Sequence, residues 1–151
     1  MLSRLIAKSI LPIVSLWAKR HERVILQTGT PLTEGELIDA RRVGVQHPER
    51  VRTLVVEIVP PRLPPMMRAL AERFGWGPST TAGMALGYGI FIRTNQRGSR
   101  SLLLHELVHT AQYERLGMRT FLEQYLQECL SVGYPLGALE AEAQRTARNF
   151  I

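Results

Sequence analysis

The segment 101–117, SLLLHELVHTAQYERLG, places two histidines and a glutamate in the most apolar part of a predicted helix. Gly117 is a typical residue to end such a helix. His105 and His109 are four residues apart, so both imidazoles leave the same side of the helix, and Glu106 follows the first histidine directly. A largely apolar helix is expected to be buried, and buried imidazole and carboxylate groups need polar partners. The fold must therefore supply partners for these side chains.

The spacing of the two histidines suits a metal ion. At positions i and i+4, both imidazole nitrogens can reach one tetrahedral zinc ion at about 2.0–2.1 Å. Glu106 points about a third of a turn away, so it can flank the ion and act on a water molecule without being a ligand. In this HExxH arrangement the glutamate is the general base. The motif therefore predicts His105 and His109 as zinc ligands and Glu106 as a catalytic base.

The third ligand has several candidates in the sequence. Zinc sites of this kind take three protein ligands and leave the fourth position open. His21 and His47 are the remaining histidines, and neither lies in a supporting motif. The segment LEAEAQ, on a later predicted helix, offers Glu140 and Glu142. Their side chains diverge by roughly 200° at helical periodicity, so only one of the two is expected to face the metal.

The motif at 105–109, followed by a glutamate-bearing helix, resembles the gluzincins, the thermolysin-like HExxH…E zinc metallopeptidases. Their downstream motif is often ExxxD, with the glutamate as ligand and the aspartate as its support. The resemblance puts the third ligand at Glu140, while Gln144 stands in the aspartate position. The metzincin pattern does not apply, because Gln112 and Arg115 stand where that family has glycine and histidine.

The resemblance is concentrated in residues 80–150. The sequence pattern HELxHxxQ is also similar to that of small bacterial zincin-like domains, some of them associated with contractile injection systems. It implies a zincin-like fold, in which a small β-sheet packs on the active-site helix and an edge strand can pair with an extended peptide. The strand expected over 85–93 is the candidate. Gly87 and Gly89 suit either the close approach of a peptide backbone or packing against the active-site helix.

A peptidase would also need a hydrogen-bond donor for the oxyanion. Tyr88, Tyr113 and Tyr134 are candidates, and each is more commonly an ordinary core or surface aromatic residue. Tyr134 lies in the turn before the helix that carries Glu140. We therefore select Tyr134 as the predicted donor.

The rest of the chain predicts mixed helices and strands that end in three consecutive helices. Thr33 and Glu36 form a capping-box pattern at the start of a short helix that ends at Gly44. β-branched residues predict a strand over 52–59, and alternation of residues predicts the strand over 85–93. Further helices are expected over 66–75, 101–117, 119–133 and 136–150. The chain of 151 residues is therefore expected to form one α+β domain over residues 1–151.

Residues 1–20 are predicted to form a basic amphipathic helix. Apolar residues recur at helical spacing, with Arg4, Lys8 and Lys19 on the other face, and no apolar run reaches the length of a membrane span. Such a helix can lie on a membrane surface, but packing against its own domain is more common and is our expectation. Pro12 interrupts the most apolar stretch and no clear cleavage site follows, which disfavours a signal peptide.

Composition narrows the classes of function. The single cysteine, Cys129, excludes an internal disulfide framework and favours a reducing, cytoplasmic location. The net charge is +6, but the arginines are scattered and no basic helix is interleaved with aromatic residues. Nucleic-acid binding is therefore not expected.

These observations predict a zinc-dependent metallopeptidase with one Zn²⁺ per chain and a peptide or protein substrate. His105, His109 and Glu140 would hold the zinc, and Glu106 would deprotonate a water molecule. The alternative is a zinc-containing, zincin-like binding or effector module with little or no turnover. The lack of a separate substrate-cleft domain and the glutamine at position 144 favour that alternative. A structural domain without metal is the third interpretation.

Overall fold

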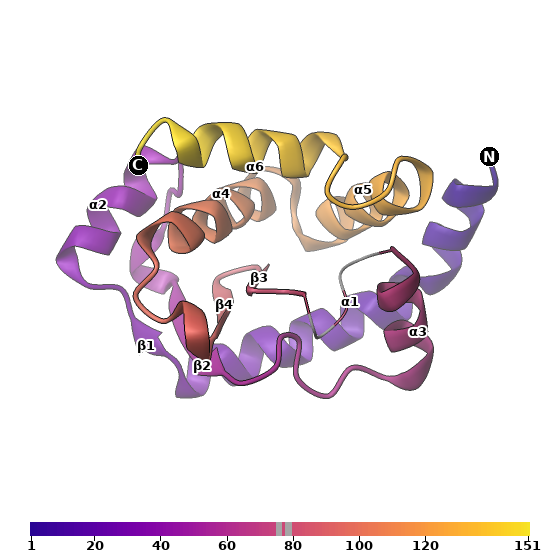
Figure 1. Cartoon of the computed structure of the whole chain (residues 1–151), viewed down its shortest axis with the longest axis horizontal. Helices are drawn as coiled ribbons and strands as arrows, with labels where there is room; N and C mark the ends of the chain where they lie inside the picture. Colours follow the sequence, from indigo (N-terminus) through magenta and orange to yellow (C-terminus); the bar gives the residue numbers. More distant parts are fainter. Residues whose placement is uncertain (75–76, 78–79) are drawn as a thin grey trace.

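The computed structural model describes residues 1–74, 77 and 80–151. Within these residues the chain forms six α-helices, four strands and two short 3-10 helices (Figure 1). In chain order they are α1 (Leu2–Thr28), β1 (Thr30–Pro31), α2 (Glu34–Arg42), η1 (Pro48–Arg50), β2 (Arg52–Val56), α3 (Pro65–Phe74), β3 (Gly83–Leu86), β4 (Gly89–Arg93), η2 (Thr94–Gln96), α4 (Arg100–Leu116), α5 (Met118–Ser131) and α6 (Ala138–Arg148). The predicted α+β fold class is confirmed.

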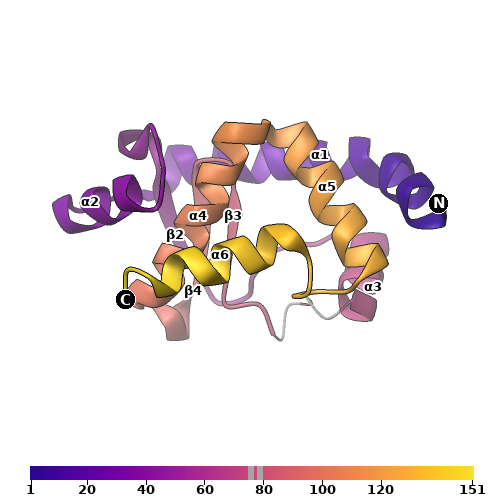
Figure 2. The same ribbon diagram turned by 90° about the horizontal axis from the view of Figure 1, so that it is seen from above.

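The four strands form one small mixed sheet in the order β1-β2-β4-β3. Strand β2 runs parallel to β4, whereas β1 and β3 are antiparallel to their neighbours. Helix α1 packs on one face of the sheet, and α4 packs on the opposite side against the edge strand β3 (Figure 1). Helix α6 lies outside α4, and α5 packs against both α4 and α1 (Figure 2). The helix with the two histidines is therefore enclosed between an edge strand and an outer helix.

Local sequence signals account for the ends of several helices. The side chain of Thr33 accepts a hydrogen bond from the backbone N–H of Glu36, and Glu36 accepts one from the backbone N–H of Thr33 at 2.8 Å. The predicted capping box is thus confirmed. Ser99 accepts from the backbone N–H of Leu102 at the start of α4. Gly117 ends α4 with a φ of 80°, a value that glycine adopts readily.

Helix α1 is part of the hydrophobic core. Its residues Leu11 and Ile25 are buried in the same cluster as Phe91 of β4 and Leu104 and Leu107 of α4. The helix predicted over 1–20 thus packs against its own domain and continues to Thr28. No helix in the described part of the chain combines the length and the apolar content that a membrane span requires.

The prediction of a single strand over 85–93 is wrong. These residues belong to the two antiparallel strands β3 and β4, with Gly87, at a φ of 63°, and Tyr88 in the turn between them. Leu86 pairs with Gly89 and Ala85 with Ile90 across the turn, so Leu86 and Ile90 lie on opposite faces of the sheet although their spacing in the sequence fits one face of a single strand. A Cβ atom at Gly89 would lie 2.9 Å from Cβ of Ile25. Gly89 is therefore required for packing against α1, and not against the active-site helix that the sequence suggested.

The other strands also differ from the predicted ones. Strand β2 ends at Val56, whereas the sequence predicted a strand over 52–59. The short strand β1 was not predicted, because its two residues carry no alternation. The predicted end of the 66–75 helix at Gly75 lies outside the described residues.

Candidate metal centre

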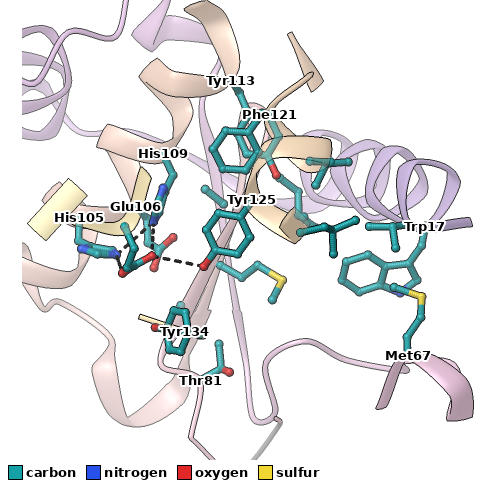
Figure 3. Close-up of a pocket in the computed structure, with 18 residues that line it drawn as sticks. Trp17, Met67, Thr81, His105, Glu106, His109, Tyr113, Phe121, Tyr125 and Tyr134 are labelled. Atoms are coloured by element: carbon teal, nitrogen blue, oxygen red, sulfur yellow. Dashed lines mark hydrogen bonds and ion pairs between the residues drawn. The ribbon is translucent and has the colours of Figure 1, made fainter. Parts of the chain in front are cut away.

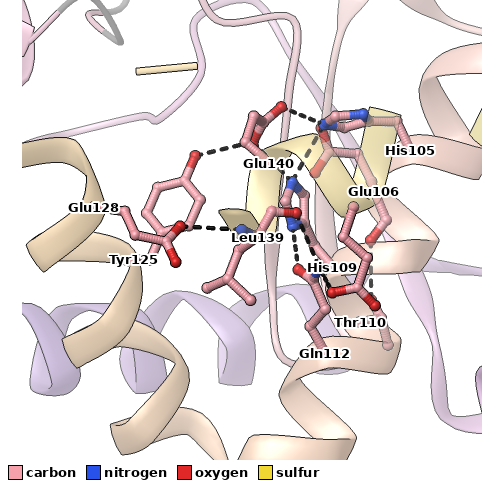
Figure 4. Close-up of polar contacts among 10 residues, drawn as sticks. His105, Glu106, His109, Thr110, Gln112, Tyr125, Glu128, Leu139 and Glu140 are labelled. Atoms are coloured by element: carbon pink, nitrogen blue, oxygen red, sulfur yellow. Dashed lines mark hydrogen bonds and ion pairs between the residues drawn. The ribbon is translucent and has the colours of Figure 1, made fainter. Parts of the chain in front are cut away.

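Two histidines of one helix and a glutamate of another meet at one point (Figure 4). His105 and His109 project from α4, and Glu140 lies in the first turn of α6. Nε2 of His105 lies 2.9 Å from Oε1 of Glu140, Nε2 of His109 lies 3.2 Å from Oε2, and the two Nε2 atoms are 3.2 Å apart. Among the described residues, these three form the one group of His, Cys, Asp and Glu close enough to hold a metal ion. The structure thus brings together the three residues predicted as ligands.

The group is largely withdrawn from solvent. Glu140 is 4% exposed and His109 is 6% exposed, whereas the side chain of His105 is 21% exposed. A buried carboxylate and two buried imidazoles are unfavourable unless they are paired or bind a cation. The site therefore faces solvent mainly on the His105 side.

Gln112 determines which nitrogen of His109 faces the cluster. The Nε2 group of Gln112 donates to the backbone carbonyl of Leu139 at 2.9 Å and to Glu142 at 3.0 Å. Its Oε1 atom therefore faces Nδ1 of His109, at 2.8 Å, and can only accept. Nδ1 carries the proton in this contact, so Nε2 faces the other two residues: it donates to Glu140 when the imidazole is protonated, and it would offer its lone pair to a metal ion when the imidazole is neutral. This orientation is the one that a metal ligand requires.

Glu142 points away from the cluster. It forms an ion pair with Arg115 at 3.0 Å and accepts the hydrogen bond from Gln112. The orientation of α6 therefore directs Glu140 toward the two histidines of α4, whereas Glu142 contacts Gln112 and Arg115 further along the same helix. Of the two glutamates left open by helical periodicity, Glu140 is the one beside the histidines.

The start of α6 is fixed by a glutamate from α5. Glu128 accepts a hydrogen bond from the backbone N–H of Leu139 at 3.0 Å and so caps the helix. A Cβ atom at Gly137, the N-cap residue, would lie 2.7 Å from Cβ of Glu128. A glycine is therefore needed for the two segments to approach closely. The contact positions Glu140, the next residue, in the first turn of α6.

Glu106 lies beside the three residues and is not one of them (Figure 4). It is buried, and a Cβ atom at Gly83 would lie 3.0 Å from its Oε1 atom. The missing side chain of Gly83 thus leaves room for the carboxylate against strand β3. Burial raises the pKa of Glu106, with His105 and His109 opposing the effect, and a backbone hydrogen bond with Ala85 stabilises the carboxylate.

The electrostatics of the cluster favour positive charge. Burial raises the pKa of Glu140, but hydrogen bonds from His105 and His109 outweigh it and hold that pKa well below its usual range. Burial lowers the pKa of His109, but the Glu140 and Glu106 carboxylates outweigh it and raise that pKa. Two carboxylates in a buried space thus create a negative potential, which is suited to a cation.

A cavity of about 100 Å³ adjoins the cluster and is lined mainly by apolar side chains (Figure 3). Its apolar lining includes Trp17 of α1, Met67 of α3, Met84 of β3 and Leu122 of α5. His105, Glu106, His109 and Glu140 line the cavity at its polar end. The cavity therefore provides room for a group next to the candidate metal position.

The predicted oxyanion donors occupy different places. Tyr134 lines the cavity together with the cluster. Burial, and to a smaller extent the nearby Glu140 carboxylate, raises the pKa of Tyr134, so its hydroxyl keeps its proton and remains a donor. Tyr113 also lines the cavity, but it is buried and stacks on Phe121. Tyr88 donates to Glu114 at 2.8 Å and is not among the cavity-lining residues.

Tyr125 was not predicted as a site residue. Its hydroxyl donates to Oε2 of Glu140 at 3.3 Å from the buried side of α5. In the sequence it falls on the apolar stripe of the helix over 119–133, and nothing in that stripe distinguishes it from a core residue. The remaining histidines lie elsewhere, with His21 packed on Trp17 and His47 beside Glu49.

Comparisons with known proteins return no match. No protein-family model and no curated protein matches the sequence, and no solved structure matches the fold. The geometry of the site shows that His105, His109 and Glu140 form a group that can hold a metal ion, with Glu106 alongside.

Proposed function

We propose that this protein is a zinc-dependent peptidase of the zincin type. The observation that carries the proposal is the convergence of Nε2 of His105, Nε2 of His109 and the carboxylate of Glu140 at distances of 2.9–3.2 Å. Three corners of a tetrahedron around zinc are about 3.3 Å apart, given zinc–ligand distances of 2.0–2.1 Å. Two imidazoles and one carboxylate are a donor set that catalytic zinc takes. The residues thus fit zinc in both chemistry and spacing.

Zinc held by these side chains would polarise a carbonyl oxygen and lower the pKa of a water molecule to about 7. Glu106 accepts the proton of the attacking water and passes it to the amine that leaves. Its raised pKa suits this exchange, because a general base works best with a pKa near the operating pH. Tyr134 donates a hydrogen bond to the oxyanion from the cavity wall.

The edge strand β3 supports an extended peptide as the substrate. The backbone N–H of Arg93 donates to the carbonyl of Ala82, so the polar backbone groups of Gly83 and Ala85 point away from β4. The N–H of Ala85 already donates to Glu106, so Gly83 offers the N–H group for a peptide. An edge strand with outward-facing groups can pair with a peptide. The apolar cavity next to this strand would accept an apolar side chain of that peptide.

The test is turnover of a peptide library by zinc-loaded protein, with Glu106→Gln as the decisive variant. This variant should retain zinc, because Glu106 is outside the ligand group, and lose turnover by roughly 10²–10⁴-fold. Glu57→Gln is the matched control, since Glu57 is exposed and outside the cavity, and it should be unchanged. Turnover that survives in Glu106→Gln would contradict the proposed mechanism.

A zinc-containing binding module is the second candidate. The observation that favours it is the size of the cavity, since about 100 Å³ holds one side chain and not several. Zinc-loaded wild-type protein that binds peptides but turns none of them over would establish this function in place of the first.

A further inference from the structure

Helix α1 has two apolar faces, and only one of them is used by the fold. The face that packs against the domain consists of Ala7, Leu11, Val14, Ala18 and Ile25. In the N-terminal half of the same helix, a second set of large apolar residues is 36–71% exposed and consists of Leu2, Leu5, Ile6, Ile13 and Leu16. We call this second set the outer stripe.

The outer stripe is a continuous surface feature. At 3.6 residues per turn its five positions fall within a sector of about 100°, opposite the buried face. The N-terminal end of α1 extends beyond α3 and α5 in both views of the molecule (Figures 1 and 2). The described part of the chain covers these five side chains only in part. A contiguous exposed apolar stripe of this kind usually marks an interaction surface.

Basic side chains surround the outer stripe. Arg20 and Arg23 continue its sector toward the C-terminal end of the helix, and Arg4, Lys8 and Lys19 lie along one flank. All five are exposed, and within the described residues none of them forms an ion pair.

The sole acidic residue of α1 does not offset this charge at the stripe. The carboxylate of Glu22 accepts a hydrogen bond from the backbone N–H of Tyr88, at the hairpin between β3 and β4. It is therefore directed toward the domain. The free side of α1 combines aliphatic side chains with positive charge and carries no negative charge.

We propose that the outer stripe of α1 lies in the surface of an anionic lipid bilayer. The charge pattern favours this occupant, because the aliphatic side chains can enter the boundary between headgroups and acyl chains while Arg and Lys reach the headgroup phosphates. No described helix spans a membrane, so the contact is in the plane of the surface. The buried face of α1 remains packed on the domain throughout, so binding needs no unfolding.

The experiment is co-sedimentation of the full chain with phosphatidylcholine vesicles that contain or lack phosphatidylserine. Partitioning should be at least about tenfold stronger with phosphatidylserine, because each nearby cation adds to the attraction. It should weaken in high salt. Equal partitioning onto both kinds of vesicle, or none onto either, would overturn the proposal.

A triple variant tests the stripe itself. Leu5→Ser/Ile13→Ser/Leu16→Ser should lose at least about tenfold in partitioning and keep the wild-type Tm within a few degrees, since these side chains are exposed. The matched control, Ile38→Ser/Ile58→Ser/Ile151→Ser, removes three other exposed aliphatic side chains and should bind as the wild type does. An equal loss in both triple variants would contradict a specific surface.

Light scattering separates the bilayer from a second copy of the chain. A dimer in solution that dissociates in the Leu5→Ser/Ile13→Ser/Leu16→Ser variant, without vesicle binding by the wild type, would assign the stripe to self-association and overturn the proposal. A monomer that binds anionic vesicles would support it.

Discussion

Oε1 of Gln112 lies 2.8 Å from Nδ1 of His109, and this contact directs Nε2 of His109 toward Glu140. Both side chains are buried on α4, three residues apart. The amide of Gln112 is in turn held by Leu139 and Glu142 of α6. The two helices that supply the candidate ligands are thus joined by the residue that orients one of those ligands.

Replacing Gln112 should weaken metal binding without removing a ligand. Gln112→Leu keeps the volume but leaves His109 free to adopt either tautomer. Loss of such an outer contact typically reduces metal affinity about 10–100-fold. Chelator competition on zinc-loaded protein measures the change. Gln127→Leu, on the distant face of α5, should retain the wild-type affinity, and an equal loss in both variants would contradict an orienting role.

The two glutamates of α6 should differ sharply in their effect on zinc. Glu140→Ala removes a candidate ligand, so bound zinc should fall from about one per chain to near zero under dilute conditions. Glu142→Ala removes the partner of Arg115 and one partner of Gln112, so it should lower affinity only modestly. Metal analysis after gel filtration distinguishes the two. Equal zinc content would show that Glu140 is not a ligand.

Gly83 should be required for the position of Glu106. In Gly83→Ala the added Cβ would lie 3.0 Å from Oε1 of Glu106 and 3.2 Å from the backbone carbonyl of Phe91. The flexible carboxylate should move before the strand does, so turnover should fall about tenfold or more while zinc is retained. Gly35→Ala is the control, because no atom lies within 4 Å of its added Cβ. Unchanged turnover in Gly83→Ala would show that the carboxylate has room to adjust.

The two faces of α1 should differ in their contribution to stability. Leu11 is 3% exposed, so Leu11→Ala should lower the free energy of unfolding by about 2–4 kcal/mol. Leu5 on the same helix is 58% exposed, and Leu5→Ala should change it by about 0.5 kcal/mol or less. Urea unfolding curves measure both. Equal destabilisation would mean that the outer stripe also packs against the domain.

The ionisation of Asp39 should make the stability of the folded protein depend on pH in the acid range. Its carboxylate accepts hydrogen bonds from Arg100 at 2.7 and 2.9 Å, and these bonds lower its pKa despite its burial. A lowered pKa stabilises the folded state above the pKa of the unfolded chain, about 3.9, and this contribution is lost as the pH falls through the lower folded value. Wild type should therefore exceed Asp39→Asn in Tm at neutral pH, and the gap should shrink below about pH 4. A gap that is constant with pH would contradict this linkage.

The sequence alone determined the features that depend on neighbouring residues. Helical geometry places residues i and i+4 on one side, so the common direction of His105 and His109 follows from their spacing. The capping box at Thr33 and the stop at Gly117 are likewise local, and the structure has both. The alternation over 85–93 did not show the turn at Gly87, because the apolar residues of the two arms continue one alternating pattern in the sequence although Leu86 and Ile90 lie on opposite faces of the sheet.

Tertiary structure decided what depends on the rotation and contact of whole helices. Glu140 and Glu142 differ by their angle around α6, and packing of α6 on α4, with the cap from Glu128, selects which of them faces the histidines. Tyr125 joins Glu140 because α5 passes the same point, a contact between segments that no local pattern encodes. Periodicity likewise predicted an amphipathic N-terminal helix, but only packing showed which apolar residues remain exposed. The physical reason is that backbone geometry fixes relative directions within one helix, whereas directions between helices are set by the side chains that pack between them.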